Sequence, residues 1–214
     1  AHLAVASTDW SVSTVLDTTI VAGGTNATKG RNTPKNCIPT SGRVEVCNAA
    51  YGSNGWLGIA SIWASGSHIT QGTTRLNDTY FNTPTYNTPA WRNLVMCQEV
   101  GHTFGLDHQD ENFNNENLGT CMDYTSNPET NQHPNAHDFE ELEIIYEHLD
   151  AFTTLSQSTG QINRQLAGQP VDIATCRAML YDHQSTINGK PISSLATANE
   201  KDILRRQIKR WLGK

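Results

Sequence analysis

One short stretch of the chain carries polar side chains at spacings that suit a metal centre: Cys97-Gln98-Glu99-Val100-Gly101-His102-Thr103-Phe104-Gly105-Leu106-Asp107-His108. On a helix, Gln98 and His102 are four residues apart and project from one face, so both can reach the same ion. Glu99 lies one residue further round, where it can contact a metal-bound water without binding the metal. A catalytic zinc site needs such protein ligands together with an open coordination position.

The residues around this stretch predict a helix over 89–104 that ends in a sharp turn. Thr88 is a suitable N-cap, and Pro89 suits the first helical position. Apolar residues recur at a rough helical spacing: Trp91, Leu94, Val95 and Val100. Gly105 permits a positive φ, which ends the helix and turns the chain, so that His108 can return as a third ligand.

With Gln98 set aside, the stretch resembles the signature of the metzincin clan of zinc endopeptidases, His-Glu-x-x-His-x-x-Gly-x-x-His. Cys121-Met122-Asp123-Tyr124 follows at the distance expected of that clan's Met-turn. The resemblance implies a zinc cofactor held by Gln98, His102 and His108. It covers residues 89–124 closely and about 40–150 more loosely.

The resemblance also assigns the chemistry of the site. Zinc lowers the pKa of its water toward ~7, and Glu99 takes the proton as general base and passes it to the leaving amine. Met122 forms the hydrophobic floor under the ligands. Tyr124 matches a tyrosine that binds zinc at rest and swings toward the oxyanion. We therefore expect a secreted zinc endopeptidase with Glu99 and Tyr124 as catalytic residues.

Gln98 is the departure from the signature, which has His at this position. An amide oxygen is a poorer zinc donor than an imidazole nitrogen, although a less electron-rich ligand set leaves zinc a stronger Lewis acid. Three explanations stay open: a natural ligand in a working peptidase, an inactive pseudopeptidase that serves as a binding module, and an engineered ligand knockout. His68 is the candidate replacement ligand if Gln98 fails.

The fold implied by the resemblance is α+β: a metzincin-like catalytic domain over residues 1–150 with a twisted mixed β-sheet, an active-site helix and the Met-turn. Strand-like patterns occupy 43–49, 56–64 and 68–77, and 1–22 predicts a strand or a short helix. By the resemblance, Gly58 to Trp63 is the candidate rim strand that binds extended peptide by strand addition. The alternative is a simple core hairpin.

Three segments follow the third ligand. Residues 107–119 concentrate oxygen donors, so Ca²⁺ is a second candidate cofactor, with a solvated polar loop as the alternative; Asp110 is the candidate to orient His108. Residues 125–137 resemble the loop that shapes the S1′ pocket. Residues 138–150 predict an amphipathic helix capped by Asp138, with a buried stripe of Phe139, Leu142, Ile145 and Leu149.

Five cysteines fit two disulfides and one spare thiol. Cys37 and Cys47 bracket a loop with Pro39 and Gly42, which favours a bridge between them. The resemblance implies a second bridge, Cys97–Cys121, because the two positions are close in metzincins. Free buried thiols in a reducing compartment are the alternative, and Cys176 is left over.

Charge separates the chain into two parts. Residues 1–150 hold six Lys and Arg against 17 Asp and Glu, and residues 151–214 hold nine against four. Segment 151–214 predicts a linker over 154–170 and helices over 172–184 and 198–212. The last is basic and amphipathic, which suits either packing on the acidic domain or binding to a membrane surface or an acidic partner.

The partners expected from the sequence are proteins or peptides as substrates, with a pro-segment or an inhibitor as a further candidate. We expect no nucleic-acid partner. No stretch approaches the ~18 apolar residues of a transmembrane helix. The absence of an initiator Met and of a signal peptide fits a mature secreted form or an excised piece.

Overall fold

The computed structural model describes residues 1–65, 68–147, 186–187 and 190–191. The helices are α1 (His2–Trp10), α2 (Asp78–Phe81), α3 (Pro89–Thr103), the 3₁₀ helix η1 (Pro128–Thr130) and α4 (Ala136–Ile145). The strands are β1 (Val44–Ala49), β2 (Gly58–Ser65), β3 (His68–Asn77), β4 (Thr186–Ile187) and β5 (Lys190–Pro191). The predicted linker over 154–170 and the predicted helices over 172–184 and 198–212 lie outside the described residues, as does Cys176.

A small mixed sheet confirms the predicted α+β class. Its strand order is β1-β3-β2-β4-β5, in which β1 runs parallel to β3 and β2 runs antiparallel to β3. The three longer strands fall within a residue or two of the predicted strand-like segments. The 10-residue β3 lies between β1 and β2, which pair along its two edges.

The rim predicted from Gly58 to Trp63 is only partly an open edge. Ser61 pairs with Thr186 and Ile62 pairs with Ile187, because β4 adds to β2 in parallel. A two-residue strand of the C-terminal segment therefore occupies hydrogen-bonding positions that were expected to face substrate. The sequence carried no signal for this pairing, since Thr186 and Ile187 are more than 120 residues away along the chain.

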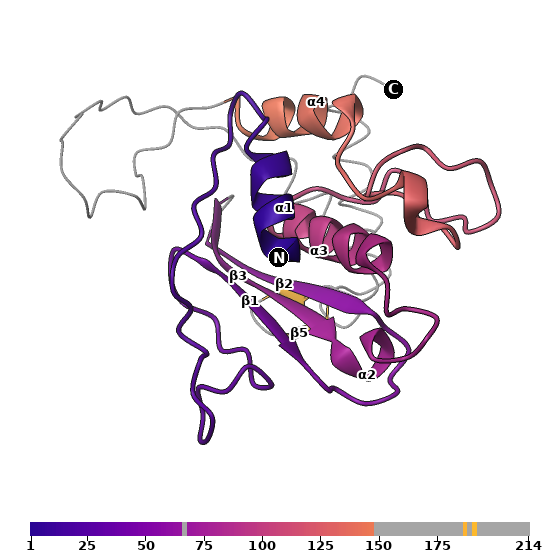
Figure 1. Cartoon of the computed structure of the whole chain (residues 1–214). Helices are drawn as coiled ribbons and strands as arrows, with labels where there is room; N and C mark the ends of the chain where they lie inside the picture. The colour runs from indigo at the N-terminus through magenta and orange to yellow at the C-terminus, as the bar shows by residue number, and fades with distance from the viewer. Residues whose placement is uncertain (66–67, 148–185, 188–189, 192–214) are drawn as a thin grey trace, which may run out of the picture.

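Helix α3 lies on one face of the sheet, and α1 packs on α3 (Figure 1). The helical alternative for the N-terminal segment is therefore correct for His2–Trp10. Trp10 is fully buried, and its indole Nε1 donates to the Cys97 carbonyl at 3.1 Å. This contact holds the N-terminal helix against the back of the helix that carries the predicted metal site.

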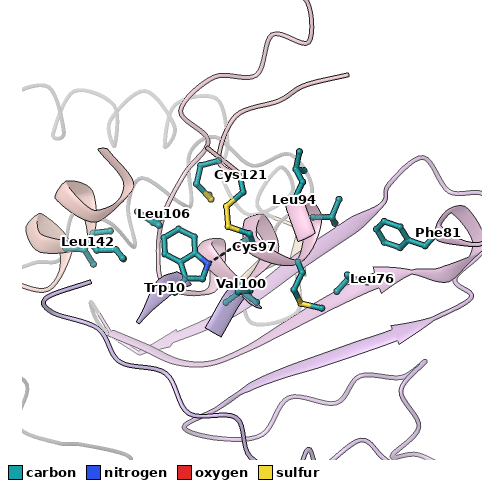
Figure 2. Packing of buried hydrophobic residues seen from close by; sticks show 14 residues of the cluster. Trp10, Leu76, Phe81, Leu94, Cys97, Val100, Leu106, Cys121 and Leu142 are labelled. Atoms are coloured by element: carbon teal, nitrogen blue, oxygen red, sulfur yellow. Dashed lines mark hydrogen bonds between the residues drawn. A yellow bond between two sulfur atoms is a disulfide. The ribbon is translucent and has the colours of Figure 1, made fainter. Parts of the chain in front are cut away.

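The hydrophobic core gathers around Trp10 and α3 (Figure 2). The Trp10 ring makes edge-to-face contacts with Phe104 and Phe139, at centroid distances of 5.9 and 6.2 Å. Burial of such aromatic side chains is the main source of stability in a domain of this size. Within the described residues, no helix is long and apolar enough to cross a membrane.

Two disulfides join the pairs expected from the sequence. Cys37 is bonded to Cys47 and Cys97 to Cys121, with a Cα–Cα distance of 5.9 Å in each pair. The second bridge links α3, one residue before Gln98, to the segment one residue before Met122 (Figure 2). The helix and the turn that hold the predicted site are thus covalently joined.

Helix α4 begins earlier than predicted, at Ala136, and ends at Ile145. Its N-cap is Asn135 and not Asp138. Asn135 accepts from the Asp138 backbone amide, and the Asp138 carboxylate accepts in return from the Asn135 backbone amide, which forms a capping box. Asn and Asp cap helices about equally well, so propensity could not choose between the two positions.

Candidate metal and catalytic site

The helix that carries the motif is confirmed almost residue for residue. α3 begins at Pro89 with Thr88 as N-cap, whose side-chain oxygen accepts from the Trp91 amide at 3.3 Å. It ends at Thr103, and Gly105 has the positive φ, +96°, that the sharp turn requires. The turn brings the chain back toward the helix, as expected for a third ligand.

Five of the predicted site residues line one cavity of about 270 Å³, at which β2 faces α3: Gln98, Glu99, His102, His108 and Tyr124. Its wall also includes Gly58 and Ile59 at the start of β2, and Asp123 of the Met-turn. Aromatic side chains make up much of the remaining wall: Trp56, Tyr86, Trp91 and Phe113.

Met122 is fully buried. An added Cβ at Gly101 would lie 2.8 Å from the Met122 Sδ and 2.6 Å from Trp10 Cζ2, so these side chains occupy the space beside the bare Gly101 backbone. Gly101 precedes His102, and Met122 therefore packs against the helix next to a predicted ligand, as a floor residue would.

The two histidines meet through their Nε2 atoms, which are 2.9 Å apart. The rings stand nearly perpendicular, at 87° with centroids 4.5 Å apart. The His102 residue is 5 % exposed. Residues six positions apart thus direct the same ring nitrogen to one point at the wall of the cavity.

Each ring is oriented through its other nitrogen. His102 Nδ1 lies 2.9 Å from the Leu106 carbonyl oxygen, and His108 Nδ1 lies 3.2 Å from Glu111 Oε1. Both partners are acceptors, so the tautomer with its proton on Nδ1 satisfies each of these contacts, and in that tautomer each Nε2 presents a lone pair. Glu111, rather than the predicted Asp110, is the carboxylate on His108, because Asp110 Oδ1 instead accepts from the Asn112 amide at 2.6 Å.

This arrangement fits a shared cation. Two Nε2 atoms that are 2.9 Å apart and direct lone pairs at each other repel unless a proton or a metal ion lies between them. Ligands about 2.0–2.1 Å from a tetrahedral zinc are about 3.3 Å apart, so the rings need only a small adjustment. A histidine ligand whose second nitrogen donates to a carbonyl or a carboxylate is the usual outer arrangement at metal sites.

The rest of the ligand set is less complete. Over the described part of the chain, no three His, Cys, Asp or Glu side chains are grouped so that they could hold a metal ion. Gln98, whose amide belongs to none of these four types, is 8 % exposed and lines the same cavity. Within that part of the chain the Gln98 side chain makes no hydrogen bond, so its amide oxygen is available to coordinate a metal ion.

Tyr124 packs between two rings. Its centroid is 4.4 Å from that of His108, and on its other side Phe113 stacks at 4.8 Å and 28°. Phe113 is itself 55 % exposed at the cavity wall. Phe113 could not be predicted from the sequence, because one aromatic residue in a polar loop has no local pattern that marks it.

Asp123, which was also not predicted, anchors the turn that carries Met122. It is fully buried, and its Oδ2 accepts from the Leu118 amide and from Asn131 Nδ2, both at 2.9 Å. Within the described residues its Oδ1 has no hydrogen-bond partner. The residue between Met122 and Tyr124 therefore fixes the turn to the loop before it and to η1, which positions Tyr124.

His68, the candidate replacement ligand, is exposed at the start of β3 and does not line the cavity. The two histidines at the end of the loop 125–137 do not line it either: His133 Nδ1 pairs with Asp9 Oδ2 at 2.7 Å, and His137 is exposed on α4. In the predicted calcium loop, Asp110 and Asn112 direct side-chain oxygens to backbone amides two residues on. These two side chains form Asx turns, and a calcium ion in this loop stays a prediction.

No protein-family model, curated protein or solved structure matches the chain.

Proposed function

We propose that this protein is a zinc-dependent endopeptidase with a metzincin-like fold, in which Gln98, His102 and His108 hold the metal. The observation that carries the proposal is the approach of the two Nε2 atoms to 2.9 Å, with an acceptor beside each Nδ1. Gln98 and Glu99 line the cavity that contains this point.

Zinc, when bound, supplies a Lewis acid and makes water acidic enough to act as a nucleophile near neutral pH. The chain's own residues do the rest. Glu99, 7 % exposed at the cavity wall, accepts the proton of the attacking water and returns it to the leaving amine. The Tyr124 hydroxyl donates to the oxygen on which negative charge develops.

Peptide is the substrate that the cavity suits best. It opens beside Gly58 and Ile59, the part of β2 before the positions that pair with β4. An extended chain laid along this edge places a backbone carbonyl near Glu99, and the aromatic wall receives an apolar side chain. The two disulfides favour a secreted protein, because such bridges persist in oxidising compartments.

The test is cleavage of unfolded casein by the purified protein and by Glu99→Gln. We expect cleavage by the wild type and a loss of at least about 10²-fold in the variant, because the general base is removed while both histidines stay. Zinc content should be equal in the two proteins. Zinc binding without cleavage in the wild type would instead favour the non-catalytic binding module.

A further inference from the structure

Gly58, the first residue of β2, has no side chain, and the side chain of Glu99 occupies the space where one would lie. An added Cβ at Gly58 would lie 2.5 Å from Glu99 Cγ, 2.7 Å from Glu99 Oε1 and 2.5 Å from Val95 Cγ1. Real Cβ atoms essentially never approach heavy atoms this closely. The side chain of Glu99 therefore lies directly against the bare backbone of the strand.

The backbones on both sides of this contact are fixed. Gly58 pairs with Leu76 in the antiparallel ladder, and it does not have the positive φ that would itself require glycine. On the helix, the Glu99 carbonyl accepts from the buried Thr74 hydroxyl of β3 at 3.2 Å. A side chain at position 58 can therefore be accommodated chiefly by displacing the side chains of Glu99 and Val95.

We propose that Gly58 is a positioning residue for the general base: the missing side chain reserves the volume that holds the Glu99 carboxylate in the cavity. This inference rests on the proposed peptidase function. The strand that borders the substrate site thereby also fixes the catalytic carboxylate, and the two are coupled by direct contact.

The direct test is Gly58→Ala, assayed for cleavage of a quenched fluorescent peptide. We expect kcat to fall by about 10- to 100-fold, because a displaced catalytic group loses its near-attack geometry. The loss should appear in kcat as well as in kcat/KM, and zinc content should be unchanged, since the three ligands remain. Unchanged kcat, or loss of zinc, would overturn the proposal.

Gly72→Ala is the matched control. Gly72 lies in the neighbouring strand β3, and its added Cβ would meet Thr103 of the same helix at 3.2 Å. Gly72→Ala therefore measures how far a methyl group added beneath α3 lowers kcat when it does not contact Glu99. We expect a kcat close to that of the wild type. An equal loss of kcat in both variants would show that helix displacement, rather than Glu99, carries the effect.

A stability cycle tests the contact without any assay of activity. Glu99→Ala removes two of the three close atoms, so Gly58→Ala should lower Tm less in the Glu99→Ala background than in the wild type. Additive effects on Tm would overturn the proposal.

Recovery of kcat when Gly58→Ala is combined with Val95→Ala would also overturn the proposal, because the contact with Val95 would then account for the loss of kcat. If the wild type cleaves no peptide, the proposed function fails, whereas the cycle still decides whether the contact exists.

Discussion

At the scale of single residues, Gln98 is expected to decide how tightly the proposed site holds a metal ion. An amide oxygen donates less electron density to zinc than an imidazole does, and among the described residues His102 and His108 are the histidines that line the cavity. Metal affinity is therefore expected to be lower than in a three-histidine site, while the Lewis acidity of the ion is expected to be higher.

Replacing Gln98 by His should tighten zinc binding by about 10- to 100-fold or more, the range by which even supporting interactions change metal affinity. Competition with a chelator of known affinity measures this. Gln98→Ala, which removes the donor atom, should weaken binding. Equal affinities in all three proteins would mean that position 98 does not touch the metal.

Residue types at fixed spacing predicted the ligand helix well, because Thr88, Pro89 and Gly105 act through their own backbone preferences. The same spacing predicted poorly which residues contact the second ring nitrogens of the histidines. Asp110 and Glu111 are equally good acceptors for His108, and which one reaches the ring depends on a turn that spacing does not define. Gly58 could not have been recognised either, since its role depends on a helix about 40 residues away.

At the scale of elements, the disulfide between Cys97 and Cys121 joins α3 to the Met-turn. The bridge is buried at both ends. It constrains the two elements that present Gln98, His102 and Tyr124, whereas the Cys37–Cys47 bridge connects β1 to the loop before it. The two bridges therefore have different expected effects on the site.

Replacing Cys97 and Cys121 together by Ala should lower the free energy of unfolding by about 3 kcal/mol through loop entropy, and should also weaken zinc binding. The control is the pair Cys37→Ala and Cys47→Ala, with a similar cost in stability and unchanged zinc affinity. Urea unfolding and chelator competition measure the two quantities. Equal zinc affinity in both double variants would show that the Cys97–Cys121 bridge does not support zinc binding.

Local signals predicted the elements themselves: burial alternates along the first part of β1, and Thr88 and Pro89 mark the start of α3, although the residues from Leu94 to Thr103 are buried all round the helix. The packing partner of α3 on its far side was not predictable. Trp10 bonds to Cys97 across 87 residues, and no periodicity within 1–22 indicates that contact. The position of β4 on β2 was hidden for the same reason.

At the scale of the whole molecule, a buried carboxylate helps the Cys37–Cys47 disulfide to hold a long irregular segment to the sheet. Glu45 of β1 is 3 % exposed and accepts from the Gly24 amide and from the hydroxyls of Thr25 and Thr40, at 2.5–3.1 Å. Burial alone would raise the pKa of Glu45. The hydrogen bonds from Thr40, Gly24 and Thr25 outweigh it, so the pKa lies below its ordinary value of 4.5.

A lowered pKa means that the ionised form of Glu45 stabilises the fold. This contribution is present above the unfolded-state pKa and is lost as the pH falls through the lower folded-state pKa. Glu45→Gln should therefore make the free energy of unfolding depend less on pH below about 4.5. Urea unfolding at several acidic pH values measures the slope, with the exposed Glu147→Gln as control. Slopes equal to that of the wild type in both variants would exclude the role of Glu45.

The central claim is that His102, His108 and Gln98 hold one zinc ion, and the metal content of the purified protein tests it most directly. We expect close to one zinc per chain after dialysis against metal-free buffer, and a loss of that zinc in His108→Ala. A wild-type protein that retains no zinc after loading, or a His108→Ala variant that retains as much as the wild type, would contradict the account.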